Sequence, residues 1–291
     1  MGAIANLFGY LLNFLYNIFN NYGIAIIIFS VILRIILIPI TISQQKSMKK
    51  NAAMQEKMNE IQKKYKNNPE KLNQETIDLY KREKVNPFSG CLSSILQIII
   101  ILSVFWLVSK PLTYMKKVDT EVINGYIEEI KNEDGKSSGY PEIQVIQRRA
   151  SADEAVNVNM DFFGLDLSKV PNQHMNDYTV YIIPVLYVIT SFISIKITNG
   201  KTKKKDKILK LEEKTSSDEN VEAKDATEDS LEAMQQMSNS MTYMIPIMSI
   251  SIAFIAPLGL ALYWLVSNIL IIIERLIIDK IYSIKEEKEN A

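Results

Sequence analysis

The residue of this chain best suited to a chemical task is an arginine inside an apolar segment. Arg34 lies near the middle of Gly23–Ile42, a run long enough to span a bilayer at about twenty residues. A charged side chain at that depth costs roughly 2.5–3.5 kcal/mol on insertion scales, because hydrocarbon cannot solvate it. We therefore expect Arg34 to face water or a partner inside the protein. No other charged residue lies mid-way in an apolar run, so we expect Arg34 to lack a carboxylate partner. Its guanidinium would then interact with a group that comes from outside the protein.

Neutral polar side chains accompany this arginine in four apolar runs. Ser30 and Thr41 share its helical face. A single Ser or Thr more often bonds the carbonyl four residues back in its own helix than marks a site. Gln97 and Asn268 differ, because a side-chain amide needs a partner on another helix. The polar residues of the other runs are Ser94, Gln97, Thr190, Ser191, Ser194, Thr198, Tyr263, Trp264, Ser267 and Asn268. Together they predict a shared hydrated cavity that carries one cation.

The composition argues against an enzyme or a metal protein. The chain has one cysteine and one histidine, Cys91 and His174, which excludes disulfides and His/Cys metal clusters. It also lacks the G-x-S-x-G, H-E-x-x-H, P-loop and Rossmann fingerprints. We expect no catalytic residue, metal or cofactor, and no nucleic-acid substrate.

Charges and apolar residues alternate in blocks, which predicts an all-α polytopic membrane protein with five spans. The expected segments are an amphipathic interfacial helix at 1–22, spans at 23–43, 89–110, 178–198, 241–256 and 258–278, a cytoplasmic hairpin at 44–88, an outer loop at 111–177, a cytoplasmic loop at 199–240 and a tail at 279–291. In the first helix, Ile4, Leu7, Phe8, Leu11, Leu12, Leu15, Ile18 and Phe19 form the expected apolar face. A further short span is the alternative for this helix. The N-terminus shows no cleavable signal pattern.

The distribution of basic residues predicts the topology. Lys and Arg outnumber Asp and Glu in 43–88, and a lysine cluster follows the third span at 201–207. The positive-inside rule places both segments in the cytoplasm. We therefore expect the N-terminus outside and the C-terminus inside a bacterial plasma membrane.

The segment 44–88 reads as two amphipathic helices joined by a turn at Asn68-Pro69 and ended by Asn86-Pro87. The apolar positions recur at helical spacing and are Met54, Met58, Ile61, Tyr65, Leu72 and Leu79. The methionines either pack across this hairpin or form an adaptable surface for hydrophobic ligands. We favour packing.

Three further sequence signals mark breaks, turns and a loop in the chain. Pro257 and Gly259 divide 242–278 into two arms, of which the first is short for a bilayer. The outer loop carries turn signals at Asn124-Gly125, Asp134-Gly135 and Tyr140-Pro141, between which we expect partial helix. Residues 201–232 resemble a mobile charged loop.

Several long motifs in this order resemble the YidC family of membrane-protein insertases, in its short Gram-positive form. They are SVILRIILIPITISQQKSMKK (30–50), KYKNNPEKLNQETIDLYKREKVNPFSGCLSSILQ (64–97), MSNSMTYMIPIMS (237–249), PLGLALYWLVSN (257–268) and, more weakly, MDFFGLDLSKVP (160–171). The resemblance implies a five-span core with a groove open to the cytoplasm and lipid and closed toward the outside. It implies client contacts for Arg34, Ser30, Gln97, Tyr263, Trp264 and, less firmly because some relatives carry Gln there, Ser194. Ser93 also departs from the family pattern, which often has Pro.

The expected function is therefore insertion and folding of nascent membrane proteins (clients) without nucleotide hydrolysis, alone or with the Sec translocon. The resemblance also implies contact of the hairpin with the ribosome and signal recognition machinery, besides membrane lipids. The slightly acidic tail, KEEKENA, predicts weak ribosome contact by the C-terminus. The alternatives are an anion channel or transporter that uses Arg34, and a structural membrane scaffold.

Overall fold

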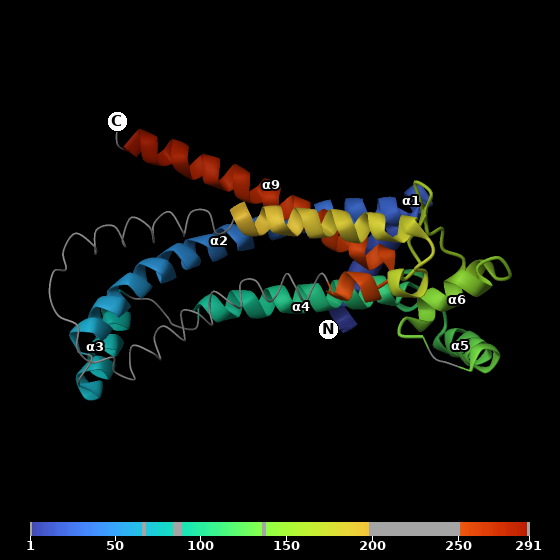
Figure 1. Ribbon diagram of the computed structural model, residues 1–291, viewed down its shortest axis with the longest axis horizontal. Coiled ribbons are helices and arrows are strands. Elements are labelled where there is room, and N and C mark those ends of the chain that lie inside the picture. Colours follow the sequence, from blue (N-terminus) through green and yellow to red (C-terminus); the bar gives the residue numbers. More distant parts are fainter. Residues whose placement is uncertain (1, 66–67, 84–88, 136–137, 198–250, 290–291) are drawn as a thin grey trace. The chain divides into compact units, whose positions relative to one another are not determined.

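The described residues are mostly helical and contain almost no strand (Figure 1), which confirms the all-α prediction. The computed structural model describes residues 2–65, 68–83, 89–135, 138–197 and 251–289. Within these ranges, four stretches are long and apolar enough to cross a membrane: Gly2–Phe19, Tyr22–Gln44, Tyr178–Ile197 and Leu258–Ile278. A shorter apolar stretch is Ile98–Ser109. Most of the span expected at 241–256, and the charged loop expected at 201–232, lie outside the described residues.

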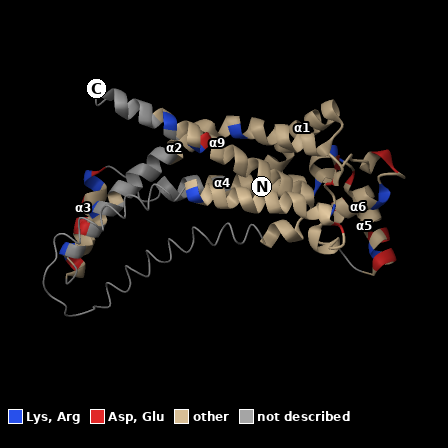
Figure 2. Cartoon of the chain, turned by 45° about the horizontal axis from the view of Figure 1, so that its top comes forward, with Lys and Arg blue, Asp and Glu red and all other residues tan. Residues whose placement is uncertain are grey.

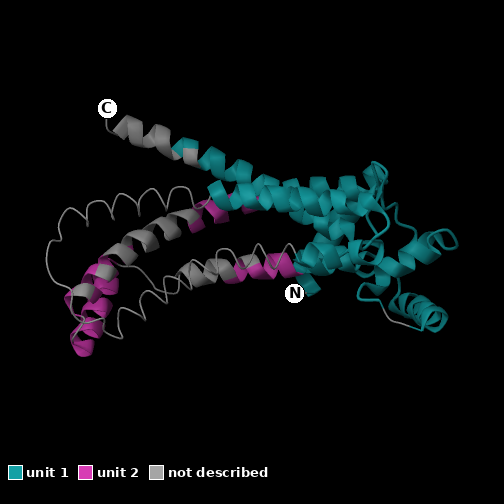
Figure 3. Cartoon of the chain, in the orientation of Figure 1, with its two compact units in different colours: residues 1–34, 103–291 teal, residues 35–102 magenta. Residues whose placement is uncertain are grey.

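The chain divides into two compact units (Figure 3). One unit contains residues 1–34 and 103–291, and the other contains residues 35–102. Helix α2 (Tyr22–Lys64) and helix α4 (Ser89–Ser109) each contribute residues to both units. Arg34 belongs to the first unit and Gln97 to the second.

The second unit contains the expected helical hairpin, formed by the end of α2 and helix α3 (Pro69–Arg82). Asn68 caps α3, its Oδ1 accepting a hydrogen bond from the Lys71 N–H at 3.1 Å, and Pro69 occupies the first helical turn. Leu79 is buried in the hairpin and Lys57 pairs with Glu83. The predicted turn is confirmed, whereas the predicted end at Asn86-Pro87 lies outside the described residues.

Helix α1 (Gly2–Phe19) packs against the π-helical turn η1 (Leu112–Lys116), and Gly9 allows its backbone to approach that of Tyr114 closely. Ala5, Gly9 and Leu12 are buried, whereas Leu7 and Ile18 are largely exposed. One part of the expected apolar face, Leu12 and Leu15, therefore packs against the protein, and another part, Leu7 and Ile18, points away from it. Such a surface suits lipid, either in the interface or within a span.

The outer segment is more regular than the sequence predicted. Helices α5 (Thr120–Asp134) and α6 (Pro141–Arg149) pack together, and within the described chain they carry a dense set of charges (Figure 2). Gly135 ends α5 with φ of 65°, and Pro141 begins α6, as their turn signals predicted. The turn expected at Asn124-Gly125 is wrong, because both residues lie on the exposed side of α5, where helical neighbours override the signal.

A short β-hairpin follows, in which β1 (Asp161–Phe162) pairs antiparallel with β2 (Leu165–Asp166). Phe163 and Gly164 join the strands with φ of 52° and 80°, the geometry of a tight hairpin turn. The remaining elements are the 3₁₀ turns η2 (Glu154–Val156), η3 (Pro171–Gln173) and η4 (Tyr178–Tyr181), helices at 182–197 and 251–255, and α9 (Leu258–Glu289). The break before Pro257 is where the sequence predicted it, while Gly259 lies inside α9.

Gly9 provides a test of the α1–η1 contact. A Cβ at Gly9 would lie 1.8 Å from the Tyr114 carbonyl oxygen, so Gly9→Ala should lower the stability by about 1–3 kcal/mol. The matched control is Gly125→Ala in α5, where the Cβ meets nothing within 4 Å. That change should leave stability equal or raise it by about 0.5–1 kcal/mol. Thermal unfolding of the purified protein in detergent measures both, and equal effects would contradict the packing described here.

Candidate functional site

The loop at 159–179 holds the starts of two apolar helices in place. The Tyr22 N–H at the start of α2 donates to the Asn159 carbonyl at 3.0 Å. At the start of α9, the N–H groups of Leu258 and Gly259 donate to the carbonyls of Lys169 and Leu167 at 2.9 and 2.8 Å. Because these bonds satisfy orphan N–H groups of helix N-termini, they fix α2 and α9 to the same loop.

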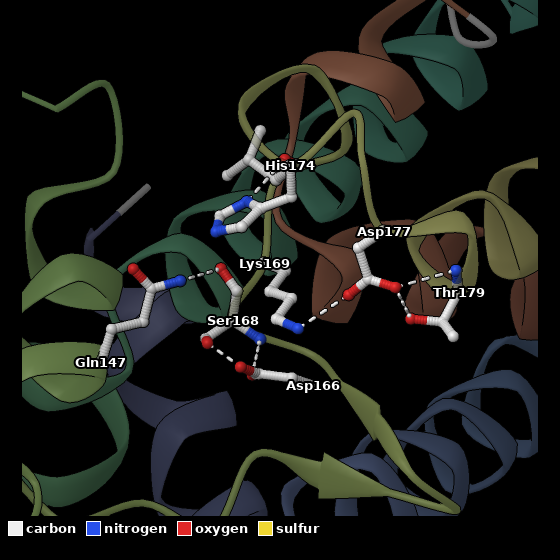
Figure 4. A network of polar contacts seen from close by, with 8 residues as sticks. Gln147, Asp166, Ser168, Lys169, His174, Asp177 and Thr179 are labelled. Carbon is white, nitrogen blue, oxygen red and sulfur yellow. Dashed lines mark hydrogen bonds and ion pairs between the residues drawn. The ribbon is translucent and has the colours of Figure 1, made fainter.

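The same loop reaches the start of the helix at 182–197 through a charged network (Figure 4). Lys169 Nζ lies 2.8 Å from Asp177 Oδ2, and Asp177 Oδ1 accepts from the Thr179 N–H at 3.0 Å. The hydrogen bond from Lys169, with those from Thr179, lowers the pKa of the Asp177 carboxyl to about 2. Gln147 of α6 donates to the Ser168 carbonyl at 2.9 Å. Three apolar helices thus share one polar anchor.

Arg34 has a carboxylate partner, which the sequence analysis did not predict. Its Nε lies 2.6 Å from Oε2 of Glu274 in α9, and the exposed fractions of the two side chains are 16% and 8%. The expectation of a lone guanidinium is therefore wrong. Glu274 lies four residues before Ile278, near the end of its apolar run, and was missed for that reason. A usable signal existed: Tyr263, Ser267 and Glu274 recur at four and seven residues, which places them on one helical face.

The contact between Arg34 and Glu274 is close but poorly directed. Among the described residues, neither carboxylate oxygen of Glu274 has a hydrogen bond of normal geometry, and neither has Nε of Arg34. Strong arginine–carboxylate pairs form two aligned N–H···O bonds. This pair compensates charge without that directed bonding, so its stabilisation is smaller than its short distance suggests.

A second face of α9 contacts the helix at 182–197. Asn268 Nδ2 donates to Ser191 Oγ at 3.1 Å and to Thr190 Oγ1 at 3.3 Å. This confirms that the Asn268 amide finds its partner on another helix. One turn earlier the rings of Trp264 and Tyr187 lie 6.1 Å apart. Polar and aromatic contacts therefore join these two apolar helices.

The other predicted site residues differ in their surroundings. Ser30 is buried and its Oγ donates to the Ile26 carbonyl of its own helix at 2.7 Å, the ordinary role for an intrahelical serine. Tyr263 is buried on the α9 face that carries Glu274, and Ser194 is half-buried. The side chain of Gln97 lies outside the described residues. Within α9, Tyr263 thus shares a face with Glu274, and Asn268 lies on a different face.

The hairpin methionines pack within the hairpin. Met54 is buried, and Met58 Sδ accepts a hydrogen bond from Thr76 Oγ1 of α3 at 3.7 Å. The other predicted hairpin residues, Ile61, Tyr65 and Leu72, are half-buried. Packing, the favoured interpretation of these methionines, agrees with their contacts. A shallow pocket of the hairpin is lined by Lys57, Glu60, Ile61, Leu79, Arg82 and Glu83.

Comparison with known proteins identifies the relatives of this chain. The model of a family described as 60Kd inner membrane protein matches residues 14–287. The membrane protein insertase YidC of Geobacter metallireducens is 27% identical over 277 residues, 95% of this chain and 37% of that protein. That of Caldanaerobacter subterraneus is 46% identical over 105 residues, 36% of this chain and 51% of that protein. The chain thus spans about half or less of the curated relatives it matches.

The Asn268 contact predicts a measurable share of the helix packing. Asn268→Ala removes both interhelical hydrogen bonds and should lower stability by about 0.6–2 kcal/mol. The control is the neighbouring Ile269→Ala, whose side chain is exposed on the surface of the protein and should matter less. Thermal unfolding in detergent compares the two variants. A smaller loss for Asn268→Ala than for Ile269→Ala would contradict the assignment.

The Lys169–Asp177 contact predicts an acid-sensitive anchor. Because the pKa of Asp177 falls from 3.8 to about 2 on folding, its contribution to stability is complete above pH 3.8 and is lost as the pH falls through 2. Asp177→Asn should flatten this part of the pH dependence of the unfolding temperature. An unchanged pH profile in the variant would show that another carboxyl is responsible.

Proposed function

The chain belongs to the YidC family, described as 60Kd inner membrane protein, and from that premise we propose that it inserts and helps to fold nascent membrane proteins. A family match over residues 14–287, with several membrane-spanning stretches, makes it a multi-pass membrane protein of a bacterial membrane. The observation that carries the proposed function is the set of polar groups inside its apolar helices, centred on Arg34 and Asn268.

The proposed mechanism lowers the cost of moving polar groups of a client through hydrocarbon. An unsatisfied polar group costs several kcal/mol there. Polar side chains of α2, α9 and the helix at 182–197 would replace part of the water around the client's flank. The client's apolar segment would meanwhile move into lipid, which supplies the driving force without nucleotide. No covalent bond forms or breaks, so the proposal needs no catalytic residue.

The proposed topology places the N-terminus outside and the C-terminus in the cytoplasm. The basic hairpin would then face the cytoplasm, and α5 and α6 the outside. In this orientation the loop that anchors α2 and α9 lies on the outer side. It would close the polar interior toward the outside, while clients enter from the cytoplasm and the lipid.

The proposed partners follow from this orientation. Nascent membrane proteins are the clients, and the hairpin is the surface proposed for the ribosome and the signal recognition machinery. Its pocket carries both charge signs, from Lys57 and Arg82 to Glu60 and Glu83, which suits a polar protein surface. Action beside the Sec translocon belongs to the same proposal.

The rival function, an anion channel, is less well supported. A permeating anion needs an accessible cation, but the Arg34 charge is compensated by Glu274 in α9. As long as Glu274 stays beside Arg34, its carboxylate repels a small anion that approaches the guanidinium.

Reconstitution of the purified chain tests the proposal. Liposomes that contain it should insert a single-span client with an acidic flank, measured by protease accessibility of that flank, more efficiently than empty liposomes. Equal insertion by empty liposomes would contradict the proposal. The double variant Arg34→Gln, Glu274→Gln leaves no uncompensated charge. It should insert this client about ten- to a hundredfold less, since a hydrogen bond to a charged group contributes about 1.5–3 kcal/mol.

Two single variants complete this test. Arg34→Lys should keep part of the activity, because it retains the charge but not the planar guanidinium. Ile36→Ala is the control on the same helix, since its apolar side chain is exposed on the surface of the protein. It should insert the client as the unchanged protein does.

A further inference from the structure

Glu274 occupies the position beside Arg34 that an acidic group of a client would need. We infer that Glu274 is an internal counter-ion, which an acidic client must displace, and that it thereby sets how strongly the protein prefers acidic flanks. This inference rests on the proposed function and adds a specificity-determining residue to it.

The geometry of the pair supports displacement. Arg34 and Glu274 meet through one short contact, Nε to Oε2 at 2.6 Å, and both carboxylate oxygens lack a hydrogen bond of normal geometry among the described residues. A mobile carboxylate on a client can approach the guanidinium in the bidentate arrangement that Glu274 does not reach. A client carboxylate can therefore accept better-aligned hydrogen bonds from Arg34 than Glu274 does.

The depth of the two residues makes the exchange asymmetric. Arg34 lies ten residues before Gln44, the end of its apolar stretch, or about 15 Å at 1.5 Å per residue. Glu274 lies four residues before Ile278, or about 6 Å from the end of its stretch. These distances describe the backbone positions, since the two charged groups are themselves in contact. From its backbone position a displaced Glu274 can turn toward water near the membrane surface, whereas the Arg34 backbone lies too deep for its side chain to follow. The arginine stays and the acid leaves.

The charge balance explains why a resident acid is useful. A buried guanidinium without a counter-ion is costly, so the client-free protein needs an anion near Arg34. Glu274 supplies that anion and lowers the net attraction that any client carboxylate experiences. A client with one weakly placed acid would gain little from exchange, and a client with a well-placed acid would gain more.

The experiment measures the preference for acidic flanks. Two single-span clients that differ only by Asp or Asn in the flank are inserted into liposomes holding limiting amounts of the full chain. Removal of the competitor in Glu274→Gln should raise the Asp-to-Asn insertion ratio about three- to tenfold, the range for a partly buried ion pair. Glu128→Gln in α5, an exposed acid, is the control for loss of one negative charge and should leave the ratio unchanged.

Two further variants separate competition from a structural role. Glu274→Asp keeps the charge but withdraws it from Arg34, and should raise the ratio by an intermediate amount; it also serves if Glu274→Gln does not fold. The exchange of charges, Arg34→Glu with Glu274→Arg, keeps the pair and should remove the preference for Asp. Its folding is checked by thermal unfolding beside the unchanged protein.

The outcomes distinguish the inference from the proposed function. An unchanged Asp-to-Asn ratio in a folded Glu274→Gln or Glu274→Asp variant would overturn the inference, while insertion by the unchanged protein would still support the function. A preference for Asp that survives the charge exchange would overturn it as well. If the unchanged protein inserts neither client, the proposed function itself fails.

Discussion

The charge of Arg34 is the constraint on which the interior of this protein depends. A guanidinium at mid-span cannot be left to hydrocarbon, and the structure compensates it with a carboxylate from another apolar helix. The pair couples α2 to α9, because the buried guanidinium of Arg34 needs a counter-ion and Glu274 of α9 supplies it. Its weak directionality distinguishes it from the aligned pairs that mainly hold structures together.

The two faces of α9 extend this coupling to a third helix. One face carries Tyr263 and Glu274 toward the charge of Arg34, and the other carries Trp264 and Asn268 toward the helix at 182–197. Helices in lipid gain little from burial of apolar surface against each other, so such polar and aromatic contacts define which helices meet. At one end, the loop around Lys169 holds all three helices by backbone and charged contacts. The polar interior is therefore built between helices whose starts are fixed.

This arrangement suits a protein that handles other membrane proteins. Membership of the YidC family gives the class, and the polar groups within apolar helices give a physical basis for the proposed insertion. Hydroxyl and amide groups that already bond each other can exchange partners at small cost, because a polar client group replaces what it displaces. By the same reasoning, Arg34 can exchange its counter-ion Glu274 for an acidic group of a client at small cost.

Composition and periodicity determined much of this molecule. The apolar runs, the cap at Asn68, the end of α5 at Gly135 and the need of Asn268 for an interhelical partner follow from local rules on burial, dihedral angles and hydrogen bonding, and the structure confirms them. The depth of Arg34 in its run also follows from counting residues.

Only the tertiary structure decided which groups meet. The pairing of Arg34 with Glu274 and the close approach of α1 to η1 at Gly9 depend on segments far apart in the chain. Hydrophobic periodicity states how much apolar surface a segment must cover, but not with which partner. From the sequence alone, an acid near the end of an apolar run is predicted to lie at the surface. Only the folded structure shows that Glu274 contacts the buried Arg34.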